Sequence, residues 1–228
     1  RSASRPDPTI IMETVLITGA SSGIGQATAQ LLAQRGYRVL LTARREHRLR
    51  EIESNIKAQG GHAECLVLDL SGDQALDRTM EQNKSILGSV DVLVNNAGFG
   101  FFSPLVDTPM ADIDRMLAVN LRAPMALTRR VLPGMIDRRQ GCIVNIASIA
   151  GQQGFANMTH YCATKWALRG FSAALLEECR PYGIKVAVVS PGMVNTEFFP
   201  EDFPKNRAAM LQPEEVARAV LAILENGE

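Results

Sequence analysis

The stretch Thr18-Gly19-Ala20-Ser21-Ser22-Gly23-Ile24-Gly25 stands between a short β-rich run and a segment with helical periodicity, and it decides the fold. Glycines let a backbone turn tightly and approach a ligand with no Cβ in the way. The free N–H groups that open a helix carry a partial positive charge, which suits phosphate. The sequence therefore predicts a dinucleotide pyrophosphate site made by Gly19, Ser21, Ser22, Gly23, Ile24 and Gly25. The glycine pattern by itself also fits a plain Gly/Ser turn.

Strand-like and helix-like patterns alternate on both sides of this turn. Apolar runs without alternation predict strands at residues 14–18, 38–43, 64–68, 90–95, 142–147 and 185–190. Helices are predicted at 24–34, 46–59, 74–87, 110–139, 159–182 and 216–224, with Pro124 and Pro133 kinking or shortening the fourth. Strands that are apolar on both faces are typical of a parallel sheet covered by helices. We expect an α/β, Rossmann-type, doubly wound sheet in one domain over residues 13–228.

The composition excludes several classes of partner. The chain has 228 residues, 46% hydrophobic and 21% charged, and its 24 Lys and Arg balance its 24 Asp and Glu. The chain has no net charge that would attract nucleic acid, and none of its apolar runs is long enough to span a membrane. The four dispersed cysteines predict buried thiols in a reducing, cytoplasmic setting, with no disulfide framework and no metal site. Residues 1–12 are predicted to be a disordered arm or a cloning remnant.

The end of the second predicted strand indicates which dinucleotide binds. NAD sites usually place an acidic side chain there for the ribose 2′-hydroxyl, but the sequence reads Ala43-Arg44-Arg45. A guanidinium can bind a 2′-phosphate through two parallel hydrogen bonds. NADP(H) is therefore the predicted cofactor, with Arg44 as the first candidate for the phosphate clamp and Arg45 as the second. The alternative is that both arginines only begin a solvated helix.

Further motifs follow in a fixed order and carry a family resemblance. They are Asp69-Leu70, Asn95-Asn96-Ala97-Gly98, Asn120, Ser148, Tyr161-Cys162-Ala163-Thr164-Lys165, and Pro191-Gly192 with Val194 and Thr196. From about residue 14 to residue 224 the chain resembles the short-chain dehydrogenase/reductase family, in its short single-domain form. The resemblance implies an adenine site at Asp69 and Leu70 and contacts of Asn96, Ala97 and Gly98 with the adenosine side of the cofactor. It also implies a nicotinamide-side loop formed by Pro191, Gly192, Val194 and Thr196.

The residue types indicate the chemistry. Tyr161 and Lys165 are four residues apart on one predicted helix and therefore share a face. Because the ammonium favours the phenolate, we expect a lowered pKa for Tyr161, which could then serve as general acid or base on a carbonyl or alcohol oxygen. Ser148, thirteen residues before Tyr161, is expected to donate a hydrogen bond to that oxygen. The resemblance adds that Lys165 binds the nicotinamide ribose and that Asn120 holds a water in a proton relay to Lys165.

The predicted function is an oxidoreductase that moves a hydride between NADP(H) and a carbonyl or secondary alcohol. The resemblance implies a substrate lid at about 193–211, which contains Phe198, Phe199 and Phe203. Phe99, Phe101 and Phe102 and the segment 152–158 supply further walls, so a hydrophobic substrate is a hypothesis; the same aromatics could instead pack in the core. His160 is expected to be a partly exposed neighbour of the site. The alternative functions are a non-catalytic NADP(H) sensor or scaffold and an NAD-linked alcohol dehydrogenase.

The resemblance also bears on assembly. Family members usually associate through the two long helices, here 110–139 and 159–182, and often have a further strand after the last helix. The given sequence stops at Glu228, soon after that helix. Either the further strand is missing from the given residues or the protein lacks it, which puts the family's usual tetramer in doubt, whereas a dimer through the long helices needs no such strand. The expected assembly is a homodimer or a homotetramer through the long helices.

Overall fold

A computed structural model of the chain describes residues 12–199 and 206–225. It contains one sheet of six parallel strands, in the order β3-β2-β1-β4-β5-β6. The strands are β1 (Thr14–Thr18), β2 (Arg38–Ala43), β3 (His62–Val67), β4 (Val92–Asn95), β5 (Gly141–Ile146) and β6 (Ile184–Val189). The predicted α/β class with a parallel Rossmann-type sheet is confirmed. Because the strand order reverses at β1, a crevice is expected between the loops that follow β1 and β4.

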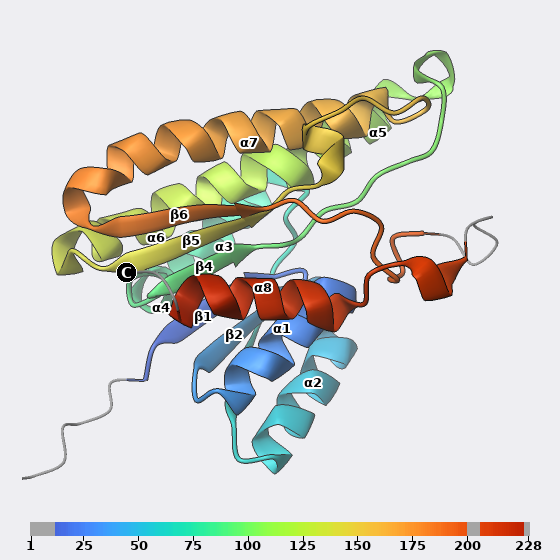
Figure 1. The fold of residues 1–228 in the computed structure, drawn as a ribbon. Helices are drawn as coiled ribbons and strands as arrows, with labels where there is room; N and C mark the ends of the chain where they lie inside the picture. The colour runs from blue at the N-terminus through green and yellow to red at the C-terminus, as the bar shows by residue number, and fades with distance from the viewer. Residues whose placement is uncertain (1–11, 200–205, 226–228) are drawn as a thin grey trace, which may run out of the picture.

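Helices cover both faces of the sheet (Figure 1). One face carries α1 (Gly23–Gln34), α2 (Glu46–Ala58) and α8 (Pro213–Glu225). The other face carries α3 (Asp73–Gln82), α4 (Lys84–Gly88), α6 (Ala123–Arg138) and α7 (Thr159–Cys179). Along β1, Val15 and Ile17 belong to the first core and Leu16 to the second, and all three are fully buried. This division explains why the strand sequence is apolar without alternation.

Two predicted helices are divided. The predicted helix 74–87 is interrupted at Asn83, whose Nδ2 donates to the Thr79 carbonyl oxygen at 2.8 Å. The predicted helix 110–139 consists of α5 (Met110–Leu117), a π-helical turn η2 (Ala118–Arg122), and α6. Pro124 lacks the N–H that a regular helix would direct at the Asn120 carbonyl, and the π turn comes just before it. Pro133 does not shorten the helix, since α6 continues through it to Arg138.

Short 3₁₀ turns complete the described chain. They are η1 (Leu105–Asp107), η3 (Ile149–Gly151), η4 (Arg180–Tyr182) and η5 (Arg207–Ala209). The long predicted helix 159–182 is thus α7 followed by η4. The predictions for residues 1–11 and for the lid residues 200–205, including Phe203, lie outside the described residues.

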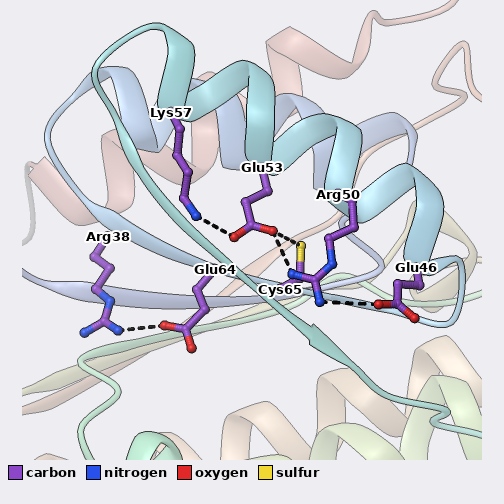
Figure 2. A network of polar contacts seen from close by, with 7 residues as sticks. All are labelled: Arg38, Glu46, Arg50, Glu53, Lys57, Glu64 and Cys65. Carbon is purple, nitrogen blue, oxygen red and sulfur yellow. Dashed lines mark hydrogen bonds and ion pairs between the residues drawn. The ribbon is translucent and has the colours of Figure 1, made fainter.

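A polar network fastens α2 to the edge strand β3 (Figure 2). The buried carboxylate of Glu53 accepts hydrogen bonds from Lys57 Nζ at 2.7 Å, Arg50 Nη1 at 3.1 Å and Cys65 Sγ at 3.0 Å. Burial by itself raises the pKa of Glu53, but these bonds outweigh it and lower the pKa to about 2. Burial, together with the neighbouring carboxylate, raises the pKa of the Cys65 thiol to about 12.

All four cysteines are free. Cys142, Cys162 and Cys179 are buried as expected, whereas Cys65 is only half-buried. Among residues 12–199 and 206–225, no helix has the length and apolar character needed to cross a membrane. The same part of the chain contains no cluster of three His, Cys, Asp or Glu side chains that could hold a metal ion.

Candidate active site

A cavity of about 770 Å³ lies where the strands end at their carboxyl sides. Its volume is within the usual range for small-molecule and cofactor sites. The predicted cofactor residues that line it are Gly19, Ser21, Ser22, Gly23, Ile24, Arg44, Arg45, Asp69, Leu70, Asn96, Ala97, Gly98, Tyr161, Lys165, Pro191, Gly192, Val194 and Thr196. Gly25 is buried outside the lining. A Cβ there would lie 2.4 Å from the Gly19 carbonyl oxygen, so this glycine packs α1 against the turn.

The turn after β1 requires glycine at two positions. Gly19 and Gly23 have φ angles of 67° and 53°. A Cβ on Gly19 would lie 2.9 Å from Ala97 Cα, and one on Gly23 would lie 2.9 Å from Thr196 Cγ2. The turn thus lies directly against the loops after β4 and β6. Ser22, the N-cap of α1, makes no capping bond through its side chain, so the first N–H groups of α1 have no capping oxygen from it. This bare backbone suits a pyrophosphate.

Positive charge gathers beside this turn. Arg45 donates from Nη2 to the hydroxyls of Ser22 at 2.7 Å and Ser21 at 3.0 Å, and Arg44 lines the cavity. Burial raises the pKa of the nearby Asp69, but two hydrogen bonds from Ser71 and the charge of Arg44 reverse this and lower it. One acidic residue that the sequence analysis did not single out also lies here. The Glu197 carboxylate pairs with Arg45 at 2.8 Å and also with Arg48.

Tyr161 lies on α7, nearly fully buried, and lines the cavity beside Ser148, which follows β5, two strands away from β1 and its glycine turn. Its surroundings contradict the expected lowering of its pKa. Burial raises the pKa of Tyr161 to about 12, and a hydrogen bond from Ser148 only partly opposes that rise. The i, i+4 spacing does bring Lys165 near, with Nζ 5.7 Å from the centroid of the Tyr161 ring. The phenol of Tyr161 is thus protonated at neutral pH.

Lys165 is buried one helical turn further along α7. Its Nζ donates to the Ile146 carbonyl oxygen at 2.8 Å, which fixes the ammonium at the end of β5. Burial lowers the pKa of Lys165 to about 8, because a charged group loses hydration there. The group remains mostly protonated at pH 7 while being close to losing its proton.

Ser148 follows β5 and caps η3. Its Oγ accepts from the Ala150 N–H at 3.1 Å, which sets the side-chain orientation beside Tyr161. The hydroxyl proton remains free to be donated to Tyr161 or to another oxygen in the cavity. Ser148 at the end of β5 and Tyr161 on α7, thirteen residues apart in sequence, thus have their hydroxyls side by side.

Asn120 occupies the π turn η2 and does not line the cavity. Its Oδ1 accepts from the Phe99 N–H at 3.0 Å, and its Nδ2 donates to the Phe99 carbonyl at 2.8 Å and to Thr164 Oγ1 at 3.2 Å. A Cβ added to Gly98 would lie 3.3 Å from Asn120 Oδ1 and 3.5 Å from Lys165 Nζ. Asn120 therefore fastens the loop after β4 to α7 close to Lys165, behind the cavity wall.

Aromatic rings form the wall around Tyr161. The Phe198 ring lies 5.4 Å from that of Tyr161 and 6.2 Å from that of Phe102, between centroids. The other predicted wall residues that line the cavity are Phe99, Phe199, Phe155 and Met158. Phe101 does not line it and packs on Phe99. His160 is buried rather than partly exposed and also lies outside the lining.

Gly100 and Arg115 are among the lining residues that the sequence analysis did not single out. A Cβ on Gly100 would lie 2.7 Å from Tyr161 Cδ2, so only glycine fits at this position beside the tyrosine ring. The Arg115 guanidinium lies 5.1 Å from the centroid of Phe99 and adds a positive charge to an otherwise apolar wall. Gly100 lies in a loop and Arg115 is a single arginine on the polar-rich helix α5, and neither carries a periodic signal that would have singled it out.

Known proteins match this arrangement. A family model described as short chain dehydrogenase matches residues 13–207. A short chain dehydrogenase of Pseudocercospora fijiensis is 38% identical over 200 residues, which are 86% of this chain and 64% of the relative. Carbonyl reductase family member 4 of Xenopus laevis is 35% identical over 92% of this chain and 90% of that protein. A metagenomic short-chain oxidoreductase, crystallised with NADP, is 39% identical with a TM-score of 0.80, and the match covers 92% and 90% of the two chains.

Fold and site together define a protein of the Rossmann class with a cavity at the carboxyl ends of its strands. More narrowly, the chain belongs to the short-chain dehydrogenase/reductase family, which is a family of oxidoreductases. The resemblance seen in the sequence motifs is thereby confirmed.

Proposed function

We propose that this protein is an NADP(H)-dependent oxidoreductase that transfers a hydride between the nicotinamide and a carbonyl or secondary alcohol, with Tyr161 as general acid and base. The observation that carries the proposal is the grouping of Tyr161, Ser148 and Lys165 at one end of a cavity whose other end has the glycine turn. A proton donor at one end and a phosphate site at the other are what such a reaction needs.

The residues present fit NADP(H). Gly19 and Gly23 leave bare backbone at the start of α1, and Arg44 and Arg45 supply guanidinium groups beside Ser21 and Ser22. A similar short-chain oxidoreductase contains NADP, which supports the same cofactor here. When bound, the nicotinamide would supply the hydride for reduction or accept it in oxidation.

In the reducing direction, Tyr161 donates its proton to the carbonyl oxygen, for which a phenol with a pKa near 12 is in the right form. Ser148 donates a hydrogen bond to the same oxygen and stabilises the charge that develops on it. Lys165 holds a positive charge close to the tyrosine ring, which favours the phenolate left after proton transfer. In oxidation the same groups act in reverse. Asn120 holds the loop at Phe99 against helix α7. In the proposed mechanism it also supports a water between itself and Lys165.

The aromatic wall favours a hydrophobic substrate. Phe102, Phe198 and Phe199 lie near one another at the tyrosine end, with ring centroids 5.1 to 6.2 Å apart. Burying apolar substrate surface against them would supply most of the binding free energy, while Tyr161 and Ser148 orient the reacting oxygen.

The active assembly is proposed to be a homo-oligomer that associates through α5, α6 and α7. Large apolar side chains are exposed on these helices, including Met110 at 66% and Trp166 at 51%, with Leu117 and Met125 also exposed. Such side chains on neighbouring helices are more typical of an interface than of a free surface.

A turnover assay tests the proposal. Purified protein is mixed with NADPH or NADH and a panel of ketones, aldehydes and alcohols, and the absorbance of the reduced nicotinamide is followed. NADPH should be consumed with bulky apolar carbonyls, and NADH much more slowly. Turnover confined to small charged compounds would contradict the hydrophobic substrate. Binding of NADPH without turnover of any compound would favour a sensor, and preference for NADH would favour an NAD-linked dehydrogenase.

A further inference from the structure

The carboxylate of Glu197 binds Arg45, one of the two arginines that we propose for the 2′-phosphate of NADP(H), in the corner between the turn after β1 and the start of α2. Arg45 uses Nε and Nη2 to bind the hydroxyls of Ser21 and Ser22, and it uses Nη1 to bind Glu197 at 2.8 Å. Arg48, one helical turn into α2, pairs with the other oxygen of the same carboxylate. A carboxylate held by two arginines beside two serine hydroxyls occupies an environment that equally suits a phosphate group.

Glu197 also belongs to a segment that lines the cavity as far as Tyr161. Its neighbours are Thr196, which touches the turn at Gly23, and Phe198, which packs on the Tyr161 ring. The far side of this segment is held by Arg207, which binds the side chain of Asn195 at 3.1 Å and the Phe199 carbonyl at 2.9 Å. The ion pairs of Glu197 therefore fasten the segment 193–199, most of which lines the cavity, to Arg45 and to α2.

We propose that Glu197 is a latch that competes with the cofactor's 2′-phosphate for Arg45 and Arg48, so that binding of NADP(H), and not of NAD(H), releases the segment 193–199 from α2. The inference rests on the proposed function and names a specificity-determining residue within it. Two negative groups cannot share one pair of arginines without repulsion. Both ion pairs are partly exposed, with about half of the Glu197 side chain in contact with solvent, so the latch is weak enough for a phosphate to displace.

Removal of the negative charge tests the competition by a binding measurement. Glu197→Gln keeps the size of the side chain and should tighten NADPH by about two- to tenfold, because the phosphate no longer has to displace a carboxylate. The Kd for NADH should stay unchanged, since it has no phosphate for this corner. The matched control is Glu53→Gln, which neutralises another carboxylate held by two cations, in Figure 2, and should leave both Kd values unchanged.

Amide hydrogen exchange tests whether the segment 193–199 is released, with probes that contain no nicotinamide. The probes are adenosine 2′,5′-bisphosphate and adenosine 3′,5′-bisphosphate, which have equal charge and differ in the position of one phosphate. The 2′,5′ compound should speed amide exchange in the peptide 193–199 of the wild type, and the 3′,5′ compound should not. In Glu197→Gln the exchange should be fast before any addition.

The results that would overturn the latch differ from those that would overturn the function. If Glu197→Gln leaves the NADPH Kd unchanged, weakens it, or tightens NADH equally, the latch is wrong. Slower exchange in 193–199 with the 2′,5′ compound would also refute it. If wild-type protein binds NADPH no better than NADH, the proposed cofactor preference itself is wrong.

Discussion

The two ends of the cavity use charge in different ways. At the tyrosine end the ionisable groups are buried, and burial raises the pKa of Tyr161 to about 12, against a hydrogen bond from Ser148, and lowers that of Lys165 to about 8. At the phosphate end they are exposed, and hydrogen bonds from Arg45 and Arg48 lower the pKa of Glu197 to about 2. Buried charges are hard to replace, whereas exposed pairs are screened by solvent and can be exchanged for another anion. One end is thus suited to chemistry and the other to reversible selection of a cofactor.

The largest expected effect lies at the buried end. Lys165→Met keeps the length of the side chain but removes the ammonium that donates to the Ile146 carbonyl. We expect kcat to fall by about 10²- to 10⁴-fold, because the phenolate loses its neighbouring charge. Steady-state kinetics with NADPH and an active ketone measure this. A kcat within about threefold of the wild type would show that Lys165 takes no part in the reaction and that the two ends do not differ in the way described above.

A smaller effect is expected at the exposed end. Arg44 lines the cavity, and Arg44→Asp places a carboxylate where NAD-preferring sites have one. The Kd for NADPH should rise by about ten- to a hundredfold while NADH binding is kept or improved. Titration of both cofactors at low salt measures it. Equal weakening of NADPH and NADH would mean that Arg44 supports the site generally and does not read the phosphate.

The smallest expected effect is on stability, at Glu53, whose carboxylate we expect to have a structural role and no role in cofactor binding, unlike that of Glu197. Glu53→Gln should lower the free energy of unfolding by about 1 kcal/mol at pH 7, since the partners Arg50 and Lys57 are themselves exposed. The pKa of Glu53 is about 2 when folded, against 4.5 for the free group, so the difference should be present at neutral pH. It should be lost as the pH falls from about 5 towards 2.

Urea unfolding of both proteins at pH 7 and pH 3.5 measures this difference. A gap between wild type and variant that widens in acid would contradict the ion-pair account of Figure 2. A change in cofactor affinity would show that this network is coupled to the cavity after all.

The fold was largely predictable because its signals are local. Apolar runs such as that of β1 mark buried parallel strands, and the glycine turn marks the first crossover. Boundaries shifted where the local signal is weak. The edge strand β3 begins at the polar His62, two residues before the prediction, because one side of an edge strand meets solvent. The π turn at Asn120 depends on the missing N–H of Pro124 together with bonds to Phe99 from a distant loop.

Most of the predicted site residues line the cavity, but their electrostatics could not be predicted. Spacing on a helix places Lys165 near Tyr161, but it does not reveal that both side chains are buried, and burial decides the direction of both pKa shifts. Glu197 escaped prediction because its position depends on how an irregular loop crosses the cavity, and Arg115 because its place depends on how α5 packs beside the loop at Phe99. No local pattern encodes such a crossing, which only tertiary packing defines.

The most direct test of the central claim is the Tyr161→Phe variant, measured for turnover and for NADPH binding on one preparation. The phenylalanine ring keeps the contacts with Phe198 and Gly100, so the cavity is preserved and only the proton donor is lost. We expect turnover to fall at least about a hundredfold while the NADPH Kd stays within about twofold of the wild type. A variant that binds NADPH normally and still reduces the ketone at the wild-type rate would contradict the account.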